Sequence, residues 1–465
     1  MKAFAALTVL VCLSAANAYA GPANRRFQHG GQRPQPIGLS GFGSPLQGVV
    51  NSPADLQTFA NGQANFKEIE TPPQVGPIFN SVSCAGCHSQ PAIGGAGLFI
   101  DEIRVRNNTA PGPLHIFAVD NMLRNGAQAQ GSTPIFASGM EAEPIGCQIT
   151  VPGCAVSTCQ KEELTRTTFD PSLPTCDPSS ASFAGGANCV VGRAATPTFG
   201  LGLVEAVSNQ ALMQLAQSEP SAVRGTVKQI TELGQLRVAR FGWKDDHATL
   251  RAFSGDAYLN EMGITNPDNP TEVSMCAVNQ YQYGILMQTA VGVEDPTDPD
   301  GHADIDRFAD FMRALAPPPT LAQNSSAQNG GRLFQQTGCA GCHAVQLTTD
   351  RNPASFIPTT TGGVVISPTL NWALANQTFH PFSDFLLHDM GSLGDGITSG
   401  VGPTMIRTAP LWGIRAKSVF LHDGRAGDIP TAISLHDGQG KASATAFQSL
   451  STQQQQDLIN FLNTI

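Results

Sequence analysis

The pattern of apolar and polar positions predicts a helix about two thirds of the way along the chain. In the stretch DIDRFADFMRALA, apolar residues recur every three or four positions, on the face made by Ile305, Phe308, Ala309, Met312, Leu315 and Ala316. Three prolines follow at once, and proline cannot continue a helix. We therefore expect the helix to end before Pro317 and a domain boundary to fall near residue 320.

A second amphipathic pattern ends the chain. Leu458, Leu462 and Ile465 are spaced for one face of a helix. Ahead of them, Thr452 and Gln455 have the spacing of a capping box, which predicts where the helix begins.

A shorter apolar run opens the chain. It follows Lys2, extends from residue 3 to 13 and leads into the small-residue sequence Ala18-Tyr19-Ala20. This order is typical of a secretory signal, whereas a membrane anchor needs about 20 unbroken apolar residues. We expect residues 1–20 to be removed, the mature protein to be periplasmic or otherwise exported, and no membrane span to follow.

Composition changes the picture in two respects. The chain has 465 residues, more than one hydrophobic core usually serves, so two or more domains are expected. Only 13% of the residues are charged, and 48 glycines and 33 prolines predict long irregular loops. The formal net charge of −10 and the absence of a basic stripe argue against a nucleic-acid partner.

Six cysteines lie outside both the signal and the motifs described next: Cys147, Cys154, Cys159, Cys176, Cys189 and Cys276. In an oxidising compartment, this even number predicts disulfides, which make a Cys-rich insertion of residues 141–193. A metal cluster is the weaker alternative, because the insertion contains no histidine and no Cys-x-x-Cys. The connectivity stays open.

The pentapeptide CAGCH occurs twice, as Cys84, Cys87 and His88 and again as Cys339, Cys342 and His343. In a cytosolic protein, the cysteine pairs could form a zinc site or a redox dithiol. In an exported protein, Cys-x-x-Cys-His is the attachment signal for c-type haem, with two thioether bonds and the histidine as an iron ligand. We therefore expect two covalently bound haems, with His88 and His343 as metal ligands.

The repeat extends upstream of the pentapeptide, since Gly76 and Phe79 match Gly331 and Phe334. The sequence thus predicts a mainly α protein with two cytochrome c-type haem domains, residues 21–320 and 321–465. An aromatic residue five positions before the first cysteine suits a helix that packs against the haem edge. The C-terminal helix is expected to pack against the helix that enters the second motif.

Acidic residues surround Gly301 just before the predicted helix: Asp295, Asp298, Asp300, Asp304 and Asp306. They could bind calcium, although Arg307 stands where an EF-hand would have its bidentate glutamate. The alternative is that these acids stabilise the helix N-terminus.

Further segments surround the motifs in a recognisable order. They are RFGWKDDHATLRAFSGDAYLNEMGITNP (240–267), DRFADFMRALAPPP, FSDFLLHDMG (382–391), RTAPLWGIR (407–415) and FLHDGR (420–425). With the two haem motifs, this order resembles the dihaem oxidoreductases, also called thiol oxidoreductases. That family is related to the bacterial dihaem cytochrome c peroxidases and to the dihaem enzymes that oxidise tryptophan side chains. The resemblance covers nearly the whole mature chain.

The resemblance implies a distal ligand for the second haem. In the peroxidases, a His-Asp-Gly segment is followed 14 residues after its histidine by that ligand, usually methionine. Here His422 begins the segment, and His436 stands at the ligand position. A haem held by His343 and His436 should have a lower potential than one held by histidine and methionine. The alternative is a surface histidine or one that binds a propionate.

The resemblance also implies residues between the haems and in the peroxide pocket. Trp243 occupies the place of a tryptophan that lies between the haems, and Glu261 that of a pocket acid that moves protons. Phe253 stands where relatives have a glutamine, which predicts a drier pocket and modest peroxidase activity. Alternatively, Trp243 is a core residue and Glu261 a surface acid.

Two function classes follow. One is a peroxidase-like oxidoreductase in which the C-terminal haem transfers electrons and the N-terminal haem reacts with a small oxidant such as peroxide. The other is a pure electron carrier with both irons saturated. They differ in the sixth ligand of the first haem, for which the sequence offers His115, Met262, His302, His388 and Met390. Either class implies a small redox protein as electron partner. The thiol oxidoreductase label gains no support, because haem and disulfides use the cysteines.

Overall fold

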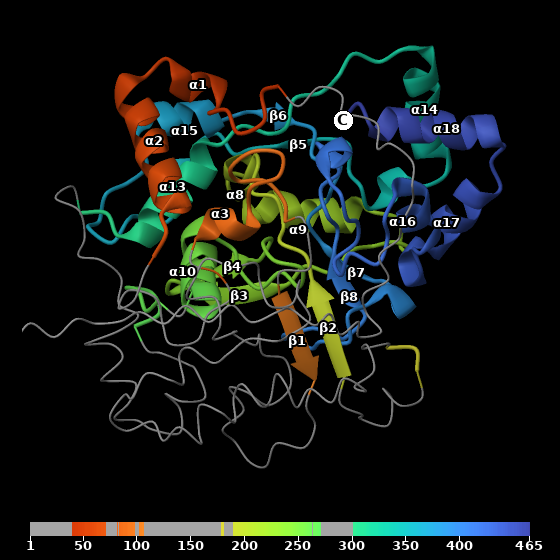
Figure 1. Ribbon diagram of the computed structural model, residues 1–465, viewed down its shortest axis with the longest axis horizontal. Helices are drawn as coiled ribbons and strands as arrows, with labels where there is room; N and C mark the ends of the chain where they lie inside the picture. Colours follow the sequence, from red (N-terminus) through yellow and green to blue (C-terminus); the bar gives the residue numbers. More distant parts are fainter. Residues whose placement is uncertain are drawn as a thin grey trace, which may run out of the picture. The chain divides into compact units, whose positions relative to one another are not determined.

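The computed structural model describes residues 40–70, 81, 83–97, 102–106, 178–180, 189–262, 264–270 and 301–465. Helices dominate this part of the chain, and four sheets of two antiparallel strands accompany them (Figure 1). The mainly α architecture predicted from the sequence is confirmed. The signal segment, Phe79, His115 and all cysteines of the predicted disulfide set except Cys189 lie outside the described residues.

The helices are α1 (Gln47–Val50), α2 (Pro53–Lys67), α3 (Cys84–Cys87), α8 (Leu201–Glu205), α9 (Asn209–Ser218), α10 (Leu250–Met262), α13 (Asp304–Ala314), α14 (Ser325–Gln336), α15 (Pro368–Leu374), α16 (Ile429–Ser434), α17 (Lys441–Gln448) and α18 (Thr452–Leu462). Short 3-10 helices are η3 (Cys339–Gly341), η4 (Pro353–Ser355), η5 (Gly391–Leu393), η6 (Ile414–Ala416) and η7 (Gly438–Gly440). The paired strands are β1 (Glu102–Arg106) with β2 (Cys189–Arg193), β3 (Gln229–Glu232) with β4 (Gln235–Val238), β5 (Leu347–Thr348) with β6 (Thr378–Phe379), and β7 (Leu387–Asp389) with β8 (Met405–Arg407).

Each haem motif is preceded by a helix that packs against a second helix from later in the chain. Helix α2 precedes the first motif and packs against α13, while α14 precedes the second and packs against α18 (Figure 1). A glycine lies at each crossing: a Cβ on Gly62 would come within 2.5 Å of the Arg307 carbonyl oxygen, and one on Gly330 within 1.9 Å of that of Asp457. Each helix pair therefore requires glycine for its close approach. The predicted packing of the C-terminal helix on α14 is confirmed.

The start of α18 differs from the prediction by one residue. The capping box is formed by Ser451 and Gln454, not by Thr452 and Gln455: the Ser451 hydroxyl accepts from the Gln454 N–H at 3.3 Å, and the Ser451 N–H donates to Gln454 Oε1 at 3.0 Å. The sequence STQQQQ contains both pairs at the same spacing, so the spacing alone could not choose between them.

At the start of α13, the acidic residues that the structure describes bind protein groups. Asp304 accepts from Asn65 Nδ2 at 2.8 Å and from the Tyr258 hydroxyl at 3.0 Å. Asp306 accepts from the Ala303 N–H at 3.1 Å and from Thr361. These two carboxylates fit the helix N-terminus alternative, and the other three acids of the predicted calcium loop lie outside the described residues.

Buried apolar side chains form two clusters. The larger one combines α2, α8, α10 and α13 with residues from β5 to Trp412, so segments from both sides of residue 320 share it. The smaller one is built by α14, α16, α17 and α18. The predicted division into residues 21–320 and 321–465 stays a prediction. Among the described residues, no helix is long and apolar enough to cross a membrane.

Candidate haem centres

Each Cys-x-x-Cys-His motif forms one short turn. The first occupies α3, and the His88 N–H donates to the Cys84 carbonyl at 3.0 Å. The second occupies η3, where the His343 N–H donates to the Cys339 carbonyl at 3.0 Å. Both turns thus place the two thiols and the histidine side by side.

The first cysteine of each motif has a raised thiol pKa. All four are free thiols in the structure. Burial, followed by the charge of Glu70, raises the pKa of Cys84 to about 12, and burial also raises the pKa of Cys339. A reactive dithiol requires a lowered thiol pKa. The raised pKa values of Cys84 and Cys339 are therefore unlike those of a reactive dithiol, and covalent haem attachment stays a prediction.

Three histidines present one ring nitrogen to a backbone carbonyl. His88 Nδ1 lies 3.3 Å from the Gly95 oxygen, His343 Nδ1 2.9 Å from that of Phe382, and His436 Nδ1 2.8 Å from that of Ala432. If Nδ1 carries the proton in each ring, Nε2 is left with a lone pair for a metal ion.

Burial lowers the pKa of all three rings, for His343 to about 4. A metal ligand must be neutral, so these shifts fit the predicted role as iron ligands.

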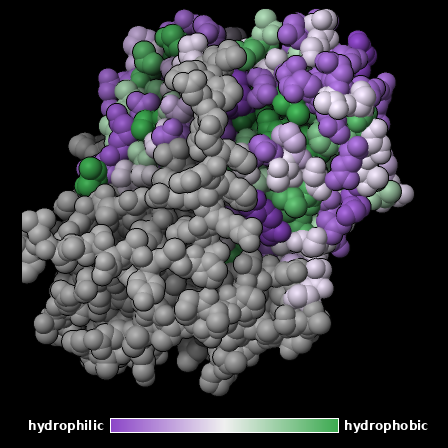
Figure 2. Space-filling model, turned by 45° about the vertical axis from the view of Figure 1, so that its right-hand side comes forward, coloured by the Kyte–Doolittle hydropathy of each residue, from purple (hydrophilic) through white to green (hydrophobic). Residues whose placement is uncertain are grey.

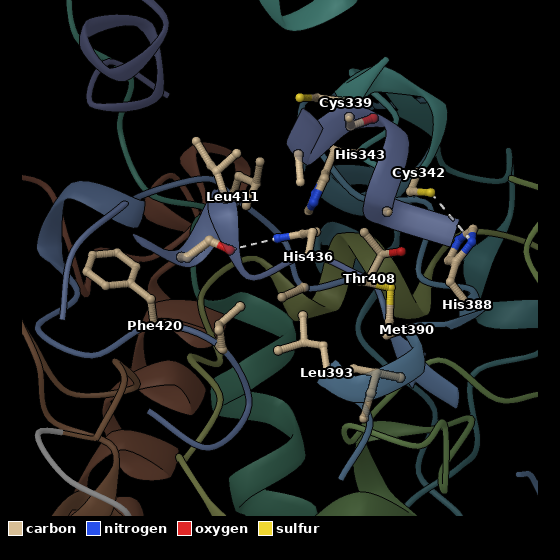
Figure 3. A pocket seen from close by; sticks show the side chains of 18 of the residues that line it. Cys339, Cys342, His343, His388, Met390, Leu393, Thr408, Leu411, Phe420 and His436 are labelled. Carbon is tan, nitrogen blue, oxygen red and sulfur yellow. Dashed lines mark hydrogen bonds between the residues drawn. The ribbon is translucent and has the colours of Figure 1, made fainter. Parts of the chain in front are cut away.

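The C-terminal cavity encloses about 1320 Å³ of empty space that includes open solvent. His343 and His436 face each other across it, with ring centroids 6.5 Å apart (Figure 3). Cys339 and Cys342 lie on the His343 side, and Phe334 of α14 contacts the His343 ring at 6.4 Å. Figure 2 turns forward the side of the molecule that carries α14, α16, α17 and α18. On this side, apolar side chains gather within a hydrophilic border. The cavity therefore brings together the residues predicted to hold the second haem.

His388 and Met390 also line the C-terminal cavity, so the structure does not place them beside the first motif. His388 Nε2 lies 3.0 Å from Asp384 Oδ2, and its Nδ1 lies 3.5 Å from Cys342 Sγ (Figure 3). Burial alone would lower the pKa of His388, but these bonds raise it to about 10. Both ring nitrogens thus have a protein partner, and His388, Asp384 and Cys342 place their ligand atoms within 4.8 Å of one another.

The N-terminal cavity, with about 1160 Å³ of empty space that includes open solvent, contains the first motif. Its lining combines aromatic residues, among them Phe66 at 6.0 Å from the His88 ring, with Glu261 and Met262 of α10. Glu261 is therefore placed with Cys84, Cys87 and His88, as the resemblance implied. Of the remaining candidates for a sixth ligand, Met262 lines this cavity and is 3% exposed.

The other candidates lie elsewhere. His302 Nδ1 is 3.5 Å from Asp310 Oδ2 and does not line the cavity, and His115 lies outside the described residues.

His247 is a residue of the N-terminal cavity that the sequence analysis missed. Its Nδ1 lies 3.3 Å from Glu232 Oε2 and its Nε2 3.3 Å from Asp256 Oδ2. Burial alone would lower the pKa of His247, but Asp256 and Glu232 raise it to about 10. Both nitrogens are therefore protonated at neutral pH, and His247 is a fixed cation rather than a metal ligand. Of the described residues that line this cavity, His88 and His247 are the histidines.

Trp243 separates the two cavities. Among the described residues, it is the one that lines both. It is 6% exposed, its indole N–H donates to the Ala194 carbonyl at 3.0 Å, and its ring contacts His422 at 6.1 Å. This placement agrees with the predicted position between the haems.

Buried charges support the wall around Trp243. The Asp395 carboxylate binds Arg193 Nη2 at 2.6 Å and Lys244 Nζ at 2.8 Å, and all three side chains are almost completely buried. Burial alone would raise the pKa of Asp395, but Arg193 and Lys244 lower it to about 2. Lys244 also donates to the Met405 carbonyl at 2.7 Å. The network therefore ties β2 to the loop before β8.

The residues present fit two haems on three independent observations. Each motif lines a cavity of its own. Each motif histidine has its Nδ1 held by a carbonyl, and both cavities are lined mainly by apolar side chains.

Comparison with known proteins identifies the family. The family model described as "Di-haem oxidoreductase, putative peroxidase" matches residues 186–465, more than half of the chain. The chain belongs to this family of dihaem oxidoreductases, as the resemblance in the sequence indicated. The matched region contains the second haem motif, Trp243 and Glu261, while the first motif precedes it.

Two solved structures are similar at low identity. Hydrazine synthase of Kuenenia stuttgartiensis is 18% identical over 35% of this chain and 55% of that chain, with a TM-score of 0.23. A variant of the diheme peroxidase BthA from Burkholderia thailandensis is 14% identical over 58% of this chain and 78% of that chain, with a TM-score of 0.25. The chain thus spans little more than half of the hydrazine synthase chain. No curated protein matches it.

Proposed function

We propose that this protein is an exported dihaem c-type cytochrome that reduces a peroxide at the N-terminal centre with electrons received through the C-terminal centre. The observation that carries the proposal is the contrast between the residues that line the two cavities besides their motifs. His436 faces His343 in one, whereas the other contains Glu261 and the His247 cation. A closed centre suits electron transfer and an open one suits reaction with a small oxidant.

The chain's own residues would hold the cofactors. Cys84 and Cys87 would bind the first haem covalently, with His88 as its proximal ligand. Cys339 and Cys342 would bind the second, with His343 as proximal ligand and His436 as distal ligand. When bound, the haems supply one-electron redox chemistry and an iron to which a peroxide can bind.

In the N-terminal cavity, Glu261 is the residue proposed to handle protons. Reduction of hydrogen peroxide takes up two electrons and two protons and yields two molecules of water. The Glu261 carboxylate could accept a proton from one oxygen of a peroxide bound in this cavity and return it to the other. Phe253 also lines this cavity and stacks at 6.1 Å on Phe241, so it excludes water and donates no hydrogen bond. We therefore expect a modest rate, and Phe253→Gln to raise it.

Trp243 is proposed to lie on the path between the centres, because it borders both cavities. The electron partner is proposed to be a small redox protein. We also propose that residues 1–20 direct export and that the cysteines of the insertion pair in the oxidising compartment. Calcium binding at residues 295–306 stays a prediction.

The test is Glu261→Gln, measured by stopped-flow mixing of the fully reduced holoprotein with hydrogen peroxide. Loss of one positioned proton-transfer group should slow oxidation by about 10² to 10⁴-fold while both haems stay attached. Glu68→Gln is the matched control, since Glu68 is exposed at the end of α2 and outside both cavities. A variant that reacts as fast as the wild type would remove Glu261 from the mechanism.

The second candidate function is a pure electron carrier. Met262 favours it, because this buried thioether lines the N-terminal cavity and could close the first iron. A fully reduced wild-type protein that hydrogen peroxide leaves unoxidised would support this candidate and contradict the peroxidase proposal.

A further inference from the structure

A third, smaller void lies beside Trp243. It holds about 420 Å³ of empty space, a figure that includes open solvent. It shares Trp243, Arg407 and Lys417 with the lining of the C-terminal cavity, and Trp243 and Phe253 with that of the N-terminal cavity. The void therefore lies where the two cavities approach each other, and we call it the inter-cavity chamber.

Lys417 enters the chamber without a counter-ion. It is half-buried, and among the described residues no hydrogen bond or ion pair to its ammonium group is found. Burial, followed by the like charge of Arg407, lowers the pKa of Lys417 to about 8. An ammonium group that lines a cavity without a protein partner is available to pair with an anion there.

Arg407 is a second cation of the chamber, and the described residues do not use all of its N–H donors. Its Nε donates to the Gly242 carbonyl at 2.7 Å and its Nη1 to the Thr408 carbonyl at 3.1 Å, while no bond to Nη2 occurs within the described part of the chain. Asp245 Oδ1 lies 3.6 Å from Arg407 Nε, but burial raises the pKa of Asp245 well above its usual range. Asp245 is therefore a weak counter-ion.

The remaining cation of the chamber is satisfied by the protein. Arg240 donates to the carbonyl oxygens of Val207 and Val238 and to Asn209 Oδ1 at 2.7 Å. Lys417 and Arg407 are therefore the two cations of the chamber that can bind an anion. Both also line the C-terminal cavity.

We propose that Lys417 and Arg407 bind a propionate carboxylate of the C-terminal haem in the inter-cavity chamber. The inference rests on the proposed haem site of the C-terminal cavity. A haem carries two propionates, and charge-assisted bonds from arginine and lysine are the strong way to hold a carboxylate. The C-terminal haem is the one that both cations can reach, because both line its cavity and neither lines the N-terminal one.

The test compares Lys417→Met and Lys417→Arg in the holoprotein by resonance Raman spectroscopy and spectroelectrochemistry. Lys417→Met should shift the propionate bending bands of the C-terminal haem and lower its midpoint potential, because a nearby cation disfavours the ferric form. Lys417→Arg should restore both. Lys441→Met is the control. It also removes a lysine charge, but the Lys441 side chain on α17 is 67% exposed.

The outcomes separate this inference from the proposed function. If Lys417→Met leaves the bands and the potential unchanged while a haemochrome assay gives two haems per chain, the propionate site is wrong and the haem sites stand. A shift confined to the N-terminal haem would also overturn it. A wild-type protein with one haem per chain would contradict the proposed function itself.

Discussion

The two proposed haem centres are alike on their proximal sides and differ on their distal sides. In each, a helix leads into a one-turn motif, a second helix crosses the first at a glycine, and the motif histidine turns Nδ1 to a carbonyl. Besides its motif, the C-terminal cavity has His436 facing His343, whereas the N-terminal cavity is lined by Glu261, Met262 and the His247 cation. A repeated scaffold thus surrounds two cavities with different linings.

The difference arises from the hydrogen-bond partners of His436 and His247. His436 follows α16, and the bond from its Nδ1 to Ala432, four residues earlier, fixes the ring by local helical geometry. His247 lies between two carboxylates from β3 and α10, which keep both of its nitrogens protonated. The comparison teaches that the partners of a histidine, rather than its presence in a cavity, decide whether it can bind a metal.

The largest expected effect concerns the wall that both centres share. Asp395→Asn would leave Arg193 and Lys244 buried with one counter-charge removed, and breaking such a network typically costs about 3–5 kcal/mol. Chemical denaturation of the holoprotein would measure the loss. Lys441→Met, which removes a surface pair worth about 0–1 kcal/mol, is the control. Equal stability of both variants would show that the wall does not depend on this network.

The next prediction tests the likeness of the two helix pairs. Gly330→Ala and Gly62→Ala should each lower the free energy of unfolding by about 1–3 kcal/mol, because the new methyl group meets a backbone carbonyl of the partner helix. Gly331→Ala is the control within α14, as its Cβ would lie 3.3 Å from the Phe461 ring and helix propensity would partly compensate. If only one crossing glycine proves sensitive, the two pairs are not equivalent.

The last prediction concerns the charge of His247, which distinguishes this residue from His436. The folded-state pKa of His247 is raised to about 10 from 6.5, so its stabilisation is fully present below about pH 6.5 and is lost as pH rises through about 10. Between these values, wild-type stability should fall with rising pH relative to that of His247→Gln. Urea unfolding across this range would measure it, with the exposed His380→Gln as control. Parallel pH profiles for wild type and His247→Gln would contradict the charged state.

The local features of both centres could be predicted from the sequence. The motifs are read from five consecutive residues, and α13 and α18 follow from apolar spacing and prolines. The spacing from His422 to His436 identified the distal ligand candidate only through the family resemblance. The capping box of α18 was misplaced by one residue, because two equal patterns overlap there.

The features that the sequence did not reveal depend on contacts between distant segments. Asp395 meets Arg193 from 202 residues away, and the charge of His247 needs Glu232 and Asp256 from two separate elements. The sequence offered His388 as a ligand of the first haem, but in the structure its partners are Asp384 and Cys342. Such pairings follow from the tertiary fold, and no local pattern carries them.

The central claim is that the C-terminal iron is closed by two histidines while the N-terminal iron has an open distal side. Electron paramagnetic resonance of the oxidised holoprotein tests it most directly. The account predicts one low-spin and one high-spin ferric signal of equal amount, with the low-spin signal altered by His436→Met. Two low-spin signals in the wild type would contradict it and would favour a protein that only carries electrons.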